Sequence, residues 1–124
     1  MNTTELSSKD ISESFYNFIL TQLKGTTQCV LAHDPIAMHR IIADINSYLK
    51  YIKDVKSEYT AAQAALEQAA RINNHANLTP QELNTIMELS VEARSQIMSA
   101  LHKLNVVFSK TTSLNTDRIT YAKP

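Results

Sequence analysis

Glycine occurs only once in this chain of 124 residues, at Gly25, and proline occurs three times. Glycine-rich loops that hold phosphate groups or dinucleotides need several glycines close together, so both kinds of site are excluded. Tight β-hairpins also rely on glycine, because their turns require positive φ angles. The shortage of glycine therefore favours an all-α fold.

The charge balance and the cysteine content narrow the class of protein further. Twelve Lys and Arg residues balance twelve Asp and Glu residues, whereas nucleic-acid-binding proteins usually carry a clustered basic surplus. No apolar run approaches the length of a membrane span, and the N-terminus does not resemble a classical signal peptide. The single cysteine, Cys29, cannot form an internal disulfide. We therefore predict a cytoplasmic protein, or one secreted without a classical signal peptide, that binds neither nucleic acid nor membranes.

The first helix is expected at about residues 8–24. Ser7 is suited to be its N-cap, and Gly25 follows the last turn, where a C′ residue adopts a positive φ. The connection 26–33 is either a buried extended segment or a short helical turn. Apolar residues of the helix recur at helical spacing: Ile11, Phe15, Phe18, Ile19 and Leu23.

A much longer helix is expected at about residues 35–73. Asp34 can cap its first N–H groups, and Pro35 at the N1 position has no N–H to leave unpaired. Neither glycine nor proline interrupts the run, which would span roughly 58 Å as one helix of about 39 residues. The apolar residues alternate three and four positions apart, as in a coiled-coil seam: Met38, Ile41, Ile45, Tyr48, Ile52, Val55, Tyr59, Ala62, Leu66 and Ala69.

Thr79 and Glu82 form a capping box that starts a third helix at about residues 80–110. A short turn joins the two long helices, which predicts a long antiparallel, coiled-coil-like hairpin with the shorter N-terminal helix packed on it. Residues 1–110 would form one helical domain, and residues 111–124 an extended C-terminal tail. The seam of the third helix consists of Leu83, Ile86, Ala93, Ile97, Ala100, Leu104 and Val107.

Three helices of such unequal length leave part of the two long seams without an internal partner, unless the first helix and the connection cover them. An uncovered apolar stripe normally marks an interface. We therefore predict a non-enzymatic protein–protein interaction module, such as an assembly subunit, adaptor or chaperone, that binds another protein or self-associates as a homo-oligomer. The candidate contact residues are aromatic residues and a methionine: Phe15, Phe18, Tyr48, Tyr51, Tyr59, Met87, Phe108 and Tyr121.

Cys29, His33 and His39 have the spacing C-x3-H-x5-H, which is loosely similar to that of zinc ligands. His39 lies more than one turn inside the expected helix, and a role as helix cap already explains Asp34. We therefore interpret this stretch as a helix start and expect neither a cofactor nor catalytic residues. The alternative function is a bundle that sequesters a metal or a small molecule between its helices, through Cys29, His33, His39 and His102.

Overall fold

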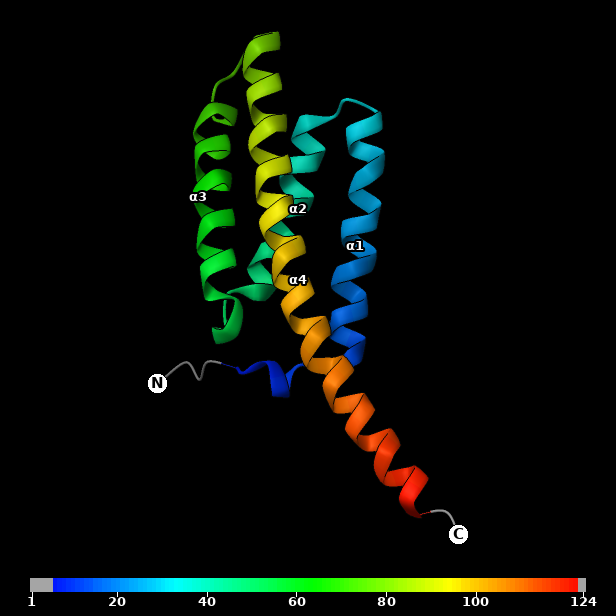
Figure 1. Ribbon diagram of the computed structural model, residues 1–124. Helices are drawn as coiled ribbons and strands as arrows, with labels where there is room; N and C mark the ends of the chain where they lie inside the picture. The colour runs from blue at the N-terminus through cyan, green and yellow to red at the C-terminus, as the bar shows by residue number, and fades with distance from the viewer. Residues whose placement is uncertain (1–5, 123–124) are drawn as a thin grey trace.

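The computed structural model describes the backbone of residues 6–122 and the side chains of residues 6–106. Within this part, four α-helices run alternately up and down and pack as a bundle (Figure 1). The predicted all-α fold is confirmed, and α3 and α4 form the predicted antiparallel hairpin. The helices are α1 (Glu13–Leu31), α2 (Pro35–Leu49), α3 (Lys56–Asn73) and α4 (Pro80–Ala122), with the 3-10 helices η1 (Ser8–Asp10) and η2 (Lys53–Val55).

The prediction of one continuous helix over residues 35–73 is wrong, because the chain reverses direction at residues 50–55. The N-terminal segment pairs with the backbone that leaves the helix at this point. The N–H of Leu6 donates to the carbonyl of Tyr51 at 2.7 Å, and the N–H of Lys53 donates to the carbonyl of Leu6 at 2.9 Å. Each such hydrogen bond contributes a modest free energy, so the pairing stabilises a reversal that contains neither a glycine nor a proline.

Two apolar residues of the reversal stay in the core. Ile52 and Val55 are fully buried, and they continue the apolar spacing of the preceding helix. The Asp54 carboxylate accepts a hydrogen bond from the N–H of Ser8 at 2.6 Å, which ties η2 to η1. The break therefore costs no apolar burial.

The reversal places α2 and α3 antiparallel and in a defined register. A ring nitrogen of His39 lies 3.2 Å from the carbonyl oxygen of Leu66, and the side-chain amide of Asn46 donates to the carbonyl of Tyr59 at 3.4 Å. Asn46 follows His39 by seven residues along α2, and its partner Tyr59 precedes Leu66 by seven residues along α3. The expected rod is folded into two helices of a bundle.

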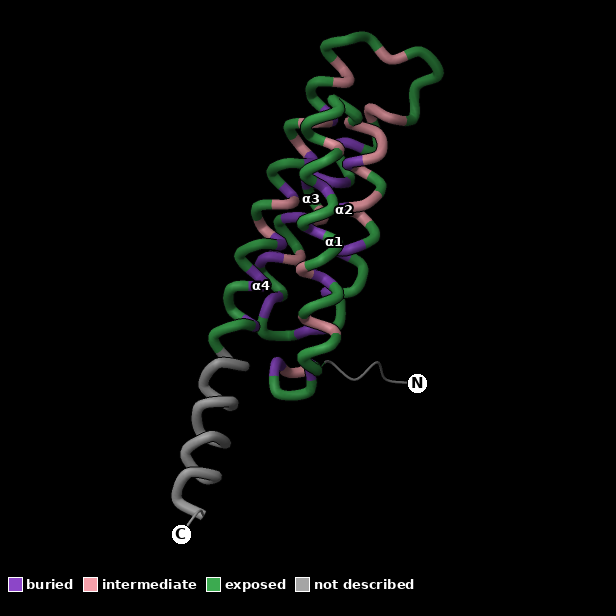
Figure 2. Tube along the Cα trace, turned by 90° about the vertical axis from the view of Figure 1, so that its right-hand side faces the viewer, coloured by how far each residue is buried: buried purple, intermediate pink, exposed green. Residues whose placement is uncertain are grey.

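The seams of α2, α3 and α4 face one shared core, as Figure 2 shows by the buried residues on the inner sides of the helices. The expectation that part of the two long seams lacks an internal partner is therefore wrong within residues 6–106, apart from one position. Tyr48 is the one seam position there that is exposed. The buried seam residues are Met38, Ile45, Ile52, Val55, Ala62, Leu66, Ala69, Ile86, Ala93, Ile97, Ala100 and Leu104.

The expected bounds of the first helix, residues 8–24, are also wrong. Ser7 precedes η1, whereas Ser12 caps α1 by accepting a hydrogen bond from the N–H of Phe15 at 3.1 Å. Gly25 lies inside α1, which continues through most of the connection 26–33. The residue with positive φ that ends α1 is His33, at 52°.

Hydrogen bonds around His33 have the pattern of a Schellman motif. The N–H of His33 donates to the carbonyl of Val30 at 3.1 Å, and the N–H of Asp34 donates to the carbonyl of Cys29 at 3.0 Å. Histidine is one of the non-glycine residues enriched in this left-handed conformation. The left-handed residue that ends α1 is therefore a histidine, whereas the sequence pattern predicts a glycine in this role.

The two later helix starts are as predicted. Asp34 accepts a hydrogen bond from the N–H of Ala37 at 3.1 Å, with Pro35 at the first helical position. Thr79 and Glu82 exchange hydrogen bonds of 2.9 and 3.1 Å in the predicted capping box. At its other end, α4 continues to Ala122, so the predicted helix end at residue 110 is wrong, and residues 111–122 of the predicted extended tail are helical.

We predict that Gly25→Ala raises the free energy of unfolding by about 0.5–1 kcal/mol, because alanine is the better residue inside a helix. A Cβ atom at position 25 would meet no other atom within 4 Å. His33→Gly should also stabilise the protein, since glycine adopts positive φ without steric cost. Urea denaturation of both variants measures the two effects. Destabilisation by Gly25→Ala would mean that α1 ends at Gly25 after all.

We predict a pH-dependent effect for Asp54→Asn. The hydrogen bond from the Ser8 N–H lowers the pKa of the Asp54 carboxyl below its usual value, so the ionised carboxylate stabilises the folded state. This stabilisation is complete above the usual pKa and is lost as the pH falls through the lowered pKa of the folded state. The variant should be less stable at pH 7 by only about 0.5–1 kcal/mol, since the exposure of the carboxylate to solvent keeps its contribution small. The difference in stability should shrink in acid. Urea denaturation at pH 7 and pH 3 measures it, and Glu92→Gln, which removes an exposed carboxylate of α4, serves as the control. A difference that stays constant with pH would contradict the assignment.

Candidate interaction site

Aromatic side chains of α1 and α2 meet on the outside of the bundle. Tyr48 of α2 lies edge-to-face with Phe18 of α1, with ring centroids 5.5 Å apart and ring planes at 86°. Phe15, one turn earlier on α1, contacts Tyr48 in the same manner at 6.4 Å. Phe18 and Tyr48 remain 44% and 45% exposed. Two large aromatic residues are thus presented side by side to solvent.

A groove of about 200 Å³ lies beside these rings, between α1 and α2. Ile45 is buried at its base, and Ile41 is half-buried. Asp44 and Gln22 supply the polar groups, one from each helix. The lining residues are Phe18 and Gln22 from α1, and Ile41, Asp44, Ile45 and Tyr48 from α2.

Helical spacing explains why one side of α2 contributes four residues to this groove. Residues three, four and seven positions apart lie on one face of a helix, and Ile41, Asp44, Ile45 and Tyr48 have this spacing. Phe18 and Gln22 are four positions apart on α1 and face them. The groove is therefore a consequence of two helices packed side by side in one register.

The other predicted contact residues differ in how far they are exposed to solvent. Tyr51 lies in the reversal after α2, is 45% exposed, and has the Lys50 ammonium 5.6 Å from its ring centroid. Phe15, Tyr59 and Met87 are half-buried and pack against the core, so packing explains them. Phe108 and Tyr121 lie outside the residues whose side chains are described.

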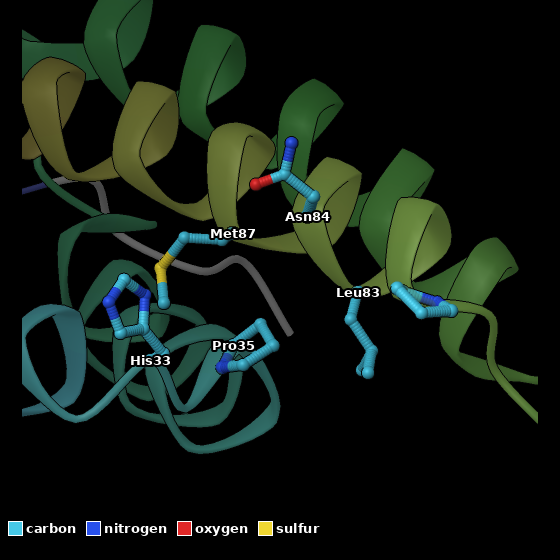
Figure 3. A pocket seen from close by; sticks show the side chains of 6 residues that line it. His33, Pro35, Leu83, Asn84 and Met87 are labelled. Atoms are coloured by element: carbon cyan, nitrogen blue, oxygen red, sulfur yellow. The ribbon is translucent and has the colours of Figure 1, made fainter.

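A second cavity, of about 240 Å³, lies at the opposite end of the bundle from the reversal (Figure 3). The imidazole of His33 and the thioether of Met87 point toward each other across it. Pro35 and Pro80, at the first positions of α2 and α4, have no N–H, and the caps at Asp34 and Thr79 pair neighbouring N–H groups. The cavity therefore offers an anion few free donors.

The predicted metal candidates are not brought together. A ring nitrogen of His39 contacts the carbonyl of Leu66, whereas His33 lines the end cavity and His102 is exposed on α4. Cys29 is half-buried on α1. Among the residues searched, which are those that the structure describes, no three His, Cys, Asp or Glu side chains are placed to share a metal ion.

The buried polar groups connect helices. The Glu58 carboxylate of α3 pairs with the Lys103 ammonium of α4 at 2.7 Å. Burial raises the pKa of the Glu58 carboxyl, but the hydrogen bond from Lys103, a backbone hydrogen bond and the charge of Lys103 together outweigh this effect, so the pKa lies below its usual value. The Arg94 guanidinium donates to the Thr26 hydroxyl at 2.7 Å. These contacts hold α3 and α1 against α4.

Comparisons with models of known protein families, with curated proteins and with solved structures give no match for this chain. In the described part of the chain, no helix combines the length and the apolar character needed to cross a bilayer. The function is therefore inferred from the geometry of the surface.

Two residues that line the groove are not among the contact residues predicted from the sequence. Asp44 and Gln22 are isolated polar residues and belong to no motif. Their spacing still indicates that each shares a helical face with a predicted aromatic residue, since Asp44 lies four positions before Tyr48 and Gln22 lies four positions after Phe18. The missing information was that α1 and α2 pack with Phe18 against Tyr48.

We predict that Phe18→Ala destabilises the protein by only about 1 kcal/mol, because Phe18 is nearly half exposed. Ile19→Ala, the matched substitution at the adjacent, fully buried position, should cost about 2–5 kcal/mol. Urea denaturation of the two variants gives both values. Equal costs would show that Phe18 belongs to the core rather than to an exposed site.

Proposed function

We propose that this protein is a non-enzymatic helical interaction module that binds another protein, or a second copy of itself, through the groove between α1 and α2. The observation that supports this most is the pair of exposed rings, Phe18 and Tyr48, on a bundle whose other seam residues within 6–106 are buried or half-buried. Aromatic residues are enriched at the centres of interfaces, where each contributes a large contact area.

The proposal differs from the sequence prediction in its mode of binding. A long uncovered seam cannot be the contact surface, because the seam residues of residues 6–106 other than Tyr48 are buried or half-buried. The groove offers a smaller surface with a defined shape. Binding would place a side chain of the partner between Phe18, Tyr48 and the base of the groove. The cytoplasmic location stays part of the proposal, and the lone cysteine agrees with it.

The alternative, a bundle that sequesters a metal or a small molecule, has weaker support. The cavity at Met87 opens at the surface between helix ends, and its side-chain polar groups come from His33 and Asn84. Small-molecule sites usually place several polar groups so that they fix the orientation of the ligand. The end cavity does not show such an arrangement.

We predict that the double variant Phe18→Ala/Tyr48→Ala weakens association about tenfold or more, because both rings would lie at the centre of the contact. Light scattering of the purified full chain measures self-association, and affinity capture with the full chain, followed by titration with the purified partner, measures binding to another protein. The matched control is Val91→Ala/Met98→Ala, which removes two exposed apolar side chains from α4.

The control variant should bind as the wild type does. Equal loss in both double variants would contradict a role specific to the groove. A wild-type chain that remains monomeric and captures no partner would contradict the proposed function itself.

A further inference from the structure

We propose that the groove between α1 and α2 binds the guanidinium group of an arginine side chain on the partner protein. This inference rests on the proposed function and names the chemistry of the partner at the same site.

Aromatic rings and a carboxylate are the two kinds of group that attract an organic cation. A cation within about 6 Å of a ring centroid is attracted by the negative face of the ring. Phe18 and Tyr48 line the groove with nearly half of each side chain exposed, and Asp44 adds a carboxylate beside them. An anion or a purely apolar partner would leave the Asp44 carboxylate uncompensated.

The Asp44 carboxylate is available for such a partner. Among the described residues, no group donates a hydrogen bond to it and no basic side chain forms an ion pair with it. Arg40, one turn earlier on α2, lines a neighbouring cavity with Ile36 and His39 instead of this groove. Asp44 borders both cavities. The groove itself is lined by one ionisable carboxylate and by no basic residue.

The shape of the groove favours a guanidinium group over an ammonium group. A guanidinium is planar, stacks on aromatic rings and donates several hydrogen bonds in a fixed fork. Asp44 and Gln22 carry acceptor oxygens and line the groove from opposite helices, which suits a donor group that presents several N–H groups in one plane. A compact ammonium group is more strongly hydrated and cannot stack on an aromatic ring as a planar group while it donates hydrogen bonds.

The size of the groove fits one long side chain. Its volume of about 200 Å³ is below the roughly 300–1,000 Å³ of pockets that hold drug-sized ligands. Ile41 and Ile45 offer an apolar base along which the methylene groups of an arginine stem can lie. An arginine anchored here would be a central contact of the interface.

The inference is tested by an NMR titration of the full-length protein with Nα-acetyl-arginine methylamide. The neutral citrulline analogue, which keeps the shape and lacks the charge, and the lysine analogue are titrated in parallel. We expect backbone amide shifts centred on residues 18–22 and 41–48, with affinities about tenfold lower for both analogues.

The variant Asp44→Asn should weaken binding of the arginine probe about tenfold, because it removes the charge and keeps the size of the side chain. Glu92→Gln, which removes a carboxylate from α4 away from the groove, should leave the affinity unchanged. Equal binding of the arginine and citrulline probes, or unchanged binding by Asp44→Asn, would overturn the inference. Equal binding of the lysine probe would overturn the choice of guanidinium.

The experiments can contradict either proposal without contradicting the other. If Phe18→Ala/Tyr48→Ala abolishes association while Asp44→Asn leaves it unchanged, arginine recognition is wrong and the interaction surface stands. If the arginine probe binds in an Asp44-dependent manner but the full chain neither self-associates nor binds a partner, the recognition chemistry stands and the proposed function is wrong.

Discussion

The fold depends on the pairing of Leu6 with the backbone on either side of Ile52, at the reversal between α2 and α3. After α2 ends at Leu49, the two hydrogen bonds join Leu6 to the carbonyl of Tyr51 and to the N–H of Lys53. Leu6, Tyr51 and Lys53 are exposed, so each of these hydrogen bonds replaces one to water and contributes roughly 0.5–1.5 kcal/mol. The short segment before α1 therefore allows residues 35–73 to form two helices of a closed bundle instead of one rod.

Local signals were sufficient to predict the starts of α2 and α4 from the sequence. Asp34-Pro35 and the capping box at Thr79 place side chains within reach of the first N–H groups, and this geometry does not depend on the rest of the molecule. The reversal was not predictable in this way, because Ile52 and Val55 fit the helical spacing whether the helix continues or breaks. Its cause is a tertiary contact with Leu6, which periodicity does not report.

The end of α1 was mispredicted for a related reason. Gly25 is the residue that local rules assign to a left-handed cap, yet a helix interior tolerates a glycine at a cost of about 1 kcal/mol. The helix ends where its last apolar contacts end, and His33 takes the strained conformation there. In the candidate site, aromatic residues were predictable as a class, but the exposure of Tyr48 followed from which helix packs beside α2.

The groove is held in place by polar contacts on the far sides of both its helices. His39 and Asn46 tie α2 to α3, and Arg94 ties α1 to α4 through the Thr26 hydroxyl and the carbonyl of Leu23. Such contacts join particular pairs of positions, so they fix the rotation and the axial position of each helix, whereas apolar packing tolerates several registers. Phe18 meets Tyr48 only in one of these registers. A site built on two fixed helices loses little conformational freedom on binding, and this preorganisation is what allows a small contact area to give useful affinity.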